Sequence, residues 1–234
     1  MAMYKVLLVE DDPEIARIVR GYLEGDGFAV TWCRRASEVS SLPDLAFDAA
    51  LLDIVLDDGS GLDVCARIRA TGDCPIIFVS CLDDSDTVIR ALEMGGDDYI
   101  VKPFDERVLA ARLKANLRRA GSLHRDASIQ ERYEFSGFSF DLTSRIVRTA
   151  SGRESKLTPL EFQLLTFLIR NPGVYYPTPE LYSNIWGKNS YGDTRTVIVL
   201  VHSLREKIEE TPSEPRYLVN SRGRGYAFML DGQR

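Results

Sequence analysis

No apolar run in this sequence approaches the roughly 20 residues that a helix needs to cross a bilayer, although 44% of its 234 residues are hydrophobic. The first residues, MAMYKVLLVEDD, reach acidic residues after only four consecutive apolar ones and lack the pattern of a cleavable signal peptide. We therefore expect a cytoplasmic protein with no membrane partner.

Histidine and cysteine are also scarce. The chain has two histidines, His124 and His202, which are too few for a histidine metal site. The cysteines show no Cys-x-x-Cys spacing, so reduced and mostly buried thiols are expected in place of a zinc or redox site. They are Cys33, Cys65, Cys74 and Cys81. The sequence has no internal repeat or low-complexity segment.

Charge is distributed unevenly along the chain. Residues 1–120 hold 14 Lys and Arg against 22 Asp and Glu, a net charge of −8, whereas residues 121–234 hold 15 against 13, a net charge of +2. An acidic half joined to a mildly basic half indicates two domains with different partners. We predict one domain at 1–120, a polar linker at 121–131 and a second domain at 132–234.

The first half alternates between apolar strand-like runs and helical patterns. Its continuous apolar strands predict an α/β domain, a doubly wound parallel sheet of five strands with helices on both faces. Such sheets place ligand sites at the carboxyl ends of their strands. The expected strands are 4–9, 28–33, 48–53, 75–80 and 98–101. The expected helices are 13–25, 36–42, 61–71, 84–94 and 105–119.

The second half has a different pattern. Residues 133–157 alternate in polarity and are rich in turn residues, as in a small antiparallel sheet. A helix is predicted to follow, capped by Thr158, with Pro159 at its first position and Glu161 in its first turn. Two more helices are expected near 178–186 and 193–210, and then a hairpin with arginine and glycine at its tip. The predicted class of this half is α+β.

Polar residues follow the expected strands of the first half where each strand ends. In a doubly wound sheet they converge on one edge, where clustered carboxylates must be protonated, bind cations or be well solvated. Oxygen ligands suit Mg²⁺ or Mn²⁺, and a nearby lysine and hydroxyl could bind a phosphoryl group placed on a carboxylate. Any one of these acids could simply be solvated at a loop, but the whole set favours a site. The set is Glu10, Asp11, Asp12, Asp53, Ser80 and Lys102.

The stretches LLVEDD, LLDIVLDDGSG, PIIFVSC and GGDDYIVKPF resemble the receiver domain of two-component response regulators. The resemblance covers about residues 3–120 and implies the flavodoxin-like strand order 2-1-3-4-5. It implies that Asp53 accepts a phosphoryl group from a sensor histidine kinase. The implied metal ligands are Glu10, Asp11, Asp53 and the backbone carbonyl of Val55. The implied switch residues are Ser80 and Tyr99, and Lys102 is the implied phosphate-binding lysine, followed by a cis Pro103.

The sequence departs from the receiver pattern near the phosphoacceptor. Asp57 stands where the family usually has proline, and Cys81 replaces the common alanine beside the switch hydroxyl. Val55 and Leu82 lie at the two positions that tune attack of water on the acyl phosphate. Because both are apolar and position no water, we expect slow self-dephosphorylation.

The stretches LTPLEFQLLTFLIRNPG, DTRTVIVLVHSLREKIE and RGRGYAF resemble the winged helix-turn-helix output domain of OmpR/PhoB-type regulators, over about 132–230. Helix 193–210 would enter the major groove of double-stranded promoter DNA and the hairpin the minor groove. Because Ile198, Leu200 and Ser203 lie away from its apolar face, base reading would include contacts with thymine methyls. The implied DNA contacts are Arg195, Thr196, His202, Ser203, Arg205, Arg222 and Arg224. The resemblance assigns residues 187–194 to RNA polymerase.

In the family that the chain resembles, phosphorylation promotes a two-fold dimer that occupies tandem half-sites. Ion pairs across this homodimer would come from Asp97, Asp98, Arg112 and Arg118, with Arg90 and Glu93 nearby. One pair that is often charged appears here as Val88 and Val108, so that contact would be apolar. Exposed ion pairs of this kind contribute little singly.

The leading hypothesis is a phosphorylation-dependent, DNA-binding transcription regulator that is not an enzyme. Phosphohydrolases that form an aspartyl phosphate are the second hypothesis, but they need an acid two residues after the nucleophile, where this chain has Val55. A regulator that works through dimer contacts without phosphate is the third. The nearly complete acidic set argues against it.

Overall fold

The computed structural model describes residues 3–42, 46–123, 132–186 and 195–232. The chain divides into two compact units, Met1–Gly121 and Ser122–Arg234. Each unit has its own hydrophobic core, so each is described by itself.

The first unit is built on a parallel sheet of five strands in the order β2-β1-β3-β6-β7. When only these five strands are numbered in chain order, their order in the sheet is 2-1-3-4-5, as predicted. The predicted doubly wound parallel sheet is therefore confirmed. The central strands are buried along almost their whole length, because helices cover both faces. The strands are β1 (Lys5–Val9), β2 (Ala29–Cys33), β3 (Ala49–Leu52), β6 (Ile76–Ser80) and β7 (Asp98–Val101).

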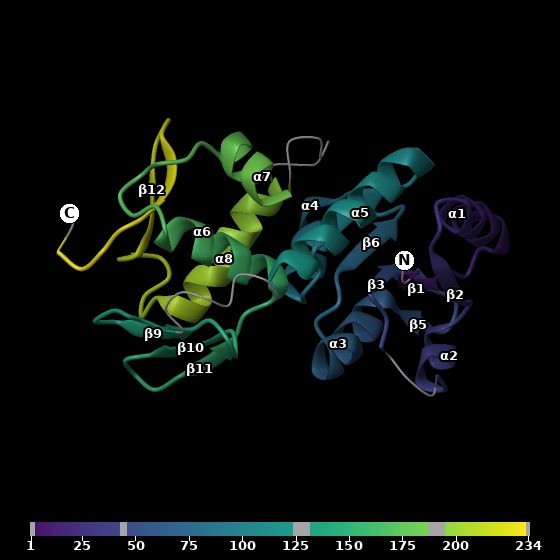
Figure 1. Cartoon of the computed structure of the whole chain (residues 1–234), viewed down its shortest axis with the longest axis horizontal. Coiled ribbons are helices and arrows are strands. Elements are labelled where there is room, and N and C mark those ends of the chain that lie inside the picture. Colours follow the sequence, from purple (N-terminus) through teal and green to yellow (C-terminus); the bar gives the residue numbers. More distant parts are fainter. Residues whose placement is uncertain (1–2, 43–45, 124–131, 187–194, 233–234) are drawn as a thin grey trace. The chain divides into compact units, whose positions relative to one another are not determined.

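Five helices enclose this sheet (Figure 1). Helices α1 (Pro13–Gly25) and α5 (Glu106–Leu123) pack their apolar residues on one face. Helices α2 (Ala36–Ser40), α3 (Gly61–Thr71) and α4 (Ser85–Glu93) pack on the other. The Lys102–Pro103 peptide is cis, as the resemblance implied.

Two features of the first unit differ from the sequence prediction. A short hairpin, β4 (Val55–Leu56) with β5 (Gly59–Ser60), follows the end of β3. Helix α5 continues to Leu123, through three residues that were assigned to the linker. A single glycine such as Gly121 weakens a helix without ending it, because it costs only about 1 kcal/mol. Residues 124–131 of the predicted linker, with His124, lie outside the described residues.

The second unit combines a four-stranded antiparallel sheet with three helices and a hairpin, which agrees with the predicted α+β class. The sheet has the order β11-β10-β9-β8. Its strands are β8 (Arg132–Glu134), β9 (Phe138–Asp141), β10 (Ile146–Thr149) and β11 (Glu154–Lys156). The other elements are α6 (Pro159–Ile169), α7 (Thr178–Trp186), α8 (Arg195–Ile208), β12 (Leu218–Ser221) and β13 (Gly225–Phe228). In Figure 1 the sheet lies on one side of the helices and the hairpin β12–β13 on the other.

The start of α6 is the helix start that the sequence predicted. Thr158 and Glu161 form a reciprocal capping box, and Pro159 occupies the first turn. Leu164, Leu165 and Leu168 of this helix are fully buried in the core of the unit. Helix α6 therefore packs both α8 and the hairpin against one apolar centre.

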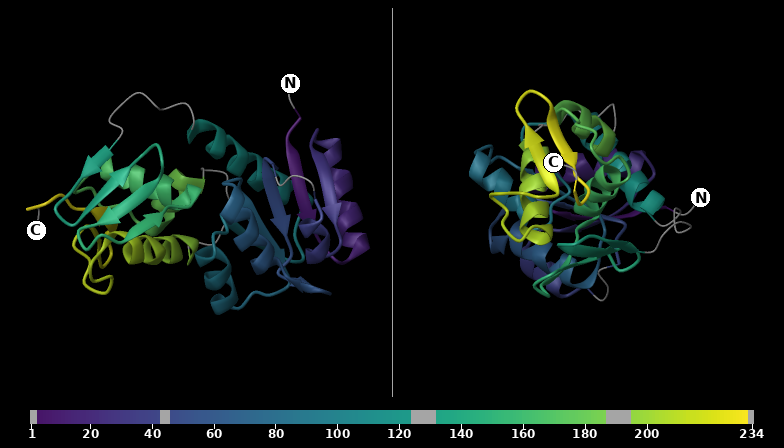
Figure 2. Two further views of the ribbon diagram at one scale, coloured as in Figure 1. Left: turned by 90° about the horizontal axis from the view of Figure 1, so that it is seen from below. Right: turned by 90° about the vertical axis from the view of Figure 1, so that its left-hand side faces the viewer.

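The hairpin β12–β13 is attached to the segment before α7. Tyr176 and Tyr226 exchange backbone hydrogen bonds of 2.8 and 2.9 Å. Gly225, with φ +96°, lies against this bridge, and a Cβ atom there would be 1.9 Å from the carbonyl oxygen of Tyr176. Only glycine fits this position. The right-hand view of Figure 2 shows the hairpin as a yellow ribbon with its turn projecting.

Candidate functional site

Three carboxylates meet at the carboxyl end of the parallel sheet. Glu10 and Asp11 follow β1, Asp53 follows β3, and one oxygen of each lies within 4.8 Å of the others. The side chains of Glu10 and Asp53 are buried, whereas Asp11 is partly exposed. Because β1 and β3 are neighbouring parallel strands, acids 43 residues apart reach one point.

The ammonium group of Lys102 completes this cluster from the end of β7. Its Nζ donates hydrogen bonds to Asp53 Oδ2 at 2.6 Å and to the two Glu10 carboxylate oxygens at 2.7 and 2.9 Å. Only 7% of the lysine side chain is exposed. The predicted Glu10, Asp11, Asp53 and Lys102 are therefore brought together by the fold.

Burial and ion pairing act in opposite directions on this cluster. Burial raises the pKa of Glu10 above that of an ordinary glutamate, against the lowering effect of its hydrogen bond with Lys102. Burial also works to lower the pKa of Lys102, but hydrogen bonds to Asp53 and Glu10 outweigh it, so this pKa is raised. The lysine consequently stays charged, and its charge is directed at the phosphoacceptor position.

The backbone around Asp53 is fixed closely. A Cβ atom at Gly61 would lie 1.9 Å from the carbonyl oxygen of Asp53, so the start of α3 packs directly on the acid. The amide of Val55 donates to Asp53 Oδ1 at 3.1 Å, and 57% of the Val55 side chain is exposed. Asp12 does not join the cluster: its Oδ1 accepts from the amides of Glu14 and Ile15 and caps α1.

The two predicted switch residues lie beside the same pocket. Ser80 ends β6 and is 1% exposed. The Tyr99 ring is 8% exposed, and its hydroxyl donates to the carbonyl oxygen of Leu82 at 2.6 Å. Burial raises the pKa of Tyr99 to about 12. The tyrosine is therefore held inward by the segment that joins β6 to α4.

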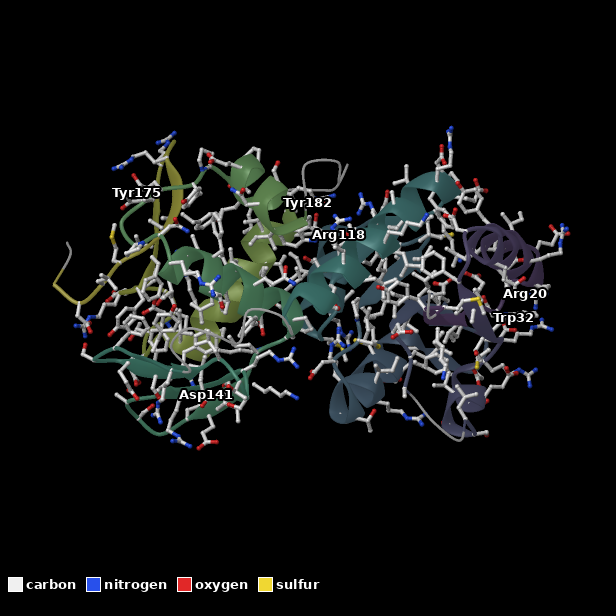
Figure 3. The ribbon with its side chains drawn as sticks, in the orientation of Figure 1. Arg20, Trp32, Arg118, Asp141, Tyr175 and Tyr182 are labelled. Carbon is white, nitrogen blue, oxygen red and sulfur yellow. The ribbon has the colours of Figure 1, made fainter. Side chains whose placement is uncertain are left out.

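The indole of Trp32 also contacts this edge of the sheet. Its Nε1 donates to the carbonyl oxygen of Glu10 at 2.9 Å. Trp32 comes from β2, which lies next to β1 in the sheet, and Figure 3 labels it. The backbone between the two predicted metal ligands Glu10 and Asp11 is thus bonded to an aromatic side chain that sequence reasoning did not single out.

Helix α8 exposes fewer polar residues than the sequence suggested. Arg195, Ile198 and His202 are exposed, with Ile198 at 53%. Thr196 is only 4% exposed, and its predicted phosphate contact stays a prediction. Leu200, expected to lie off the apolar face, is also buried.

Three further polar residues of α8 are already bonded within the unit. Ser203 Oγ donates to Glu161 Oε1 and Lys207 Nζ to Glu161 Oε2, each at 2.5 Å. Arg205 Nε donates to the carbonyl oxygen of Leu218 at 2.8 Å, and burial lowers the pKa of Arg205. These groups tie α8 to α6 and to β12, and the expected DNA contacts of Ser203 and Arg205 stay a prediction.

The tip of the hairpin matches the prediction more closely. Arg222 and Arg224 are both exposed on the turn between β12 and β13. The guanidinium carbon of Arg224 lies 4.0 Å from the centroid of the Tyr175 ring. Their contact with DNA remains a prediction.

Several residues expected in a dimer face are used inside the subunit. Asp97 Oδ2 pairs with Arg69 at 2.5 Å, and Asp98 Oδ1 pairs with Arg112 at 2.7 Å. Both aspartates are 2% exposed in the single subunit, and their ion pairs between subunits stay a prediction. Val88 is 6% exposed and belongs to the core. The expected residues that remain accessible are Arg90, Glu93, Val108 and Arg118.

Sequence reasoning also missed two acids that fix helices. Asp58, in the turn of the β4–β5 hairpin, accepts from the amides of Ala36 and Ser37 and caps α2 from a distance. The sequence placed Glu161 in the first turn of α6, but its capping role and its link to α8 were both missed. The capping-box spacing was the signal for the first role of Glu161, whereas no local signal marks a partner 42 residues away.

None of the helices in the described residues has the length and apolar character that crossing a membrane requires. The loop 187–194, which the resemblance assigned to RNA polymerase, lies outside the described residues.

A doubly wound sheet with acids, a hydroxyl and a lysine at one edge, followed by a three-helix unit with a basic hairpin, defines a receiver joined to a winged helix. Comparison with known families agrees. Residues 6–114 match the response regulator receiver domain, and residues 152–228 match the C-terminal domain of transcriptional regulatory proteins.

Similar proteins extend this match over nearly the whole length of the chain. The DNA-binding response regulator MtrA of Mycolicibacterium smegmatis is 35% identical over 223 residues, which is 95% of each chain. MtrA of Mycobacterium tuberculosis H37Rv is also 35% identical over 95% of each chain. The crystal structure of DrrB, a Thermotoga maritima OmpR/PhoB homolog, covers 97% of this chain and 100% of its own, with a TM-score of 0.53 and 29% identity.

The chain belongs to the OmpR/PhoB family of two-component response regulators. It is a DNA-binding response regulator, and its two domains imply a kinase and DNA as partners.

Proposed function

We propose that Asp53 accepts a phosphoryl group from a sensor histidine kinase and that this modification controls binding to promoter DNA. The observation that carries the proposal is the 2.6 Å contact between Asp53 Oδ2 and Lys102 Nζ in a pocket that also holds Glu10 and Asp11. A carboxylate oxygen of Asp53 attacks phosphorus, a P–O bond forms, and the P–N bond to the kinase histidine breaks. The leaving imidazole keeps the electron pair.

The side chains around Asp53 have separate roles in this transfer. Lys102 balances the negative charge of the phosphoryl oxygens, and the Ser80 hydroxyl donates a hydrogen bond to one of them. Three convergent carboxylates are the oxygen donors that Mg²⁺ or Mn²⁺ prefers, so Glu10, Asp11, Asp53 and the carbonyl of Val55 would hold the metal. A bound metal ion would supply positive charge at the phosphoryl oxygens.

The switch would act through the segment after β6. A phosphoryl group that draws Ser80 inward moves the neighbouring Leu82, whose carbonyl oxygen holds Tyr99. Phosphate would thus favour one of two arrangements of Tyr99 and α4, and the dimer that follows would occupy tandem half-sites. Its accessible residues are Arg90, Glu93, Val108 and Arg118.

In this proposal α8 lies in the major groove and the hairpin in the minor groove. The exposed candidates for DNA contact are Arg195, Ile198, His202, Arg222 and Arg224. RNA polymerase, recruited in the cytoplasm, would be the further partner.

Intact mass spectrometry after incubation with acetyl phosphate and Mg²⁺ tests the proposal. We expect one added phosphoryl group, absent in Asp53→Asn and present in the control Asp57→Asn, because Asp57 is exposed in the β4–β5 turn. Val55 and Leu82 position no water, so the adduct should outlast a few seconds. Continuous phosphate release would support a phosphohydrolase, and no adduct would support a regulator that works without phosphate.

A further inference from the structure

We propose that Tyr175 is a positioning residue for DNA binding: its ring holds the guanidinium of Arg224 ready to enter the duplex groove. The inference rests on the proposed contact between the hairpin and DNA. The inference does not depend on any residue of the receiver domain, since Tyr175 and Arg224 both belong to the second unit.

The backbone of this region fixes the ring and the arginine relative to each other. Tyr175 precedes Tyr176, which is bonded to Tyr226 of β13 through two backbone hydrogen bonds. Gly225 packs on the same bridge with no space for a side chain. Arg224 is therefore one residue from a rigid attachment, and its guanidinium carbon lies 4.0 Å from the ring centroid of Tyr175. Figure 3 labels Tyr175 beside the hairpin.

A ring contact restrains an arginine without using its hydrogen-bond donors. The guanidinium rests on the negative face of the ring, and its N–H groups point outward in the guanidinium plane. Arg205 shows the opposite case, because its Nε is already bonded to the carbonyl oxygen of Leu218. Among the described residues, none accepts a side-chain hydrogen bond from Arg224, which is exposed. Its donors face solvent in an ordered position.

Ordering the arginine before binding lowers the cost of binding. A free arginine side chain loses rotamer freedom when it enters a groove, and Tyr175 has already removed part of that freedom. Arg222, at the other end of the same turn, has no such ring contact among the described residues and provides an internal comparison.

The test measures affinity of the full-length chain, treated with acetyl phosphate and Mg²⁺, for a duplex selected by the wild type from random oligonucleotides. We expect Tyr175→Leu to weaken binding about two- to fivefold, the value of one exposed cation–π contact. Tyr175→Phe keeps the ring and should bind like the wild type. Tyr175→Leu should add nothing to Arg224→Ala, but should add its full effect to Arg222→Ala.

A readout without DNA separates positioning from folding. The Nε–H proton of Arg224 should show an upfield ring-current shift by NMR in the wild type and in Tyr175→Phe, and lose it in Tyr175→Leu at an unchanged melting temperature. Two results would overturn the role of Tyr175 and leave the DNA contact of Arg224 standing. They are unchanged affinity in Tyr175→Leu, and a further loss of affinity when Tyr175→Leu is added to Arg224→Ala. Unchanged affinity in Arg224→Ala would overturn the proposed DNA contact of Arg224, and the inference with it.

Discussion

Among individual residues, the four cysteines differ widely in their surroundings. Cys33 and Cys65 are buried, Cys74 is partly exposed and Cys81 is exposed. Burial raises the pKa of Cys65 to about 12 and that of Cys74 to about 11, and it also raises the pKa of Cys33. Reactivity follows the thiolate, so a raised pKa protects a thiol at neutral pH.

Alkylation with iodoacetamide should therefore select one site. At pH 8, a thiol with a pKa of about 12 is ionised in roughly one molecule in ten thousand, so Cys65 should stay unmodified while Cys81 reacts. Peptide mass spectrometry of the native chain would measure this. Cys81→Ser removes the early adduct, and denaturation exposes the rest. Early labelling of Cys65 in the native chain would contradict the predicted protection.

The approach of Asp53 to Lys102 could be predicted from the sequence because parallel strands end at one edge. The partners of Ser203, Arg205 and Asp97 could not. Long or small polar side chains take whichever partner tertiary packing supplies, and residue type alone favoured an exposed position for all three. The result is that a helix position facing away from the apolar stripe is not always free to contact DNA.

At the scale of elements, Glu161 joins two helices that both belong to the output unit. Its carboxylate accepts from the Thr158 amide, Ser203 Oγ and Lys207 Nζ, and its side chain is 2% exposed. One buried group therefore caps α6 and fixes α8 against it. The orientation of the expected recognition helix depends on this carboxylate.

Replacing Glu161 by alanine should lower the free energy of unfolding by about 3 kcal/mol, because it leaves the Thr158 amide and the partly exposed ammonium of Lys207 without their acceptor. Glu161→Gln keeps a hydrogen-bond acceptor but loses the charge, so its free energy of unfolding should lie between those of the wild type and Glu161→Ala. Guanidinium unfolding followed by circular dichroism gives the values. Glu206→Ala, on the exposed side of α8, is the control and should change stability by less than about 0.5 kcal/mol. A loss in Glu161→Ala no larger than this control would contradict the role.

Elements with strong local signals were predictable. Thr158 and Pro159 mark the first turn of α6, and the apolar runs mark the five parallel strands. The β4–β5 hairpin was missed because two-residue strands carry no periodicity. Its Asp58 replaces the local cap that α2 lacks, and such a contact between distant segments has no signature in either segment.

For the whole molecule, the uneven charge is the property that bears on DNA binding. The net charge is −6, yet the arginines of the hairpin turn are exposed in the less acidic half. If the protein contacts DNA through a few exposed cations and not through a broad basic surface, each of these cations accounts for a large share of the counterions released on binding.

Arg222→Ala should therefore reduce the magnitude of the slope of log affinity against log salt by about 1, and it should weaken different duplexes by similar factors. Fluorescence anisotropy across a salt series measures the slope. Arg148→Ala is the matched control, because Arg148 pairs with Glu154 on the β10–β11 sheet, and its slope should equal that of the wild type. A slope unchanged in Arg222→Ala would exclude a phosphate contact by this residue.

The chain has two tryptophans, one in each unit. Trp32 donates its indole hydrogen to the carbonyl oxygen of Glu10, while Trp186 is stacked on Tyr182 within the core of the second unit. Each half of the molecule thus carries an intrinsic optical reporter. Substituting either indole by phenylalanine isolates the emission of the other, so occupancy of the acidic pocket becomes readable in the unlabelled protein.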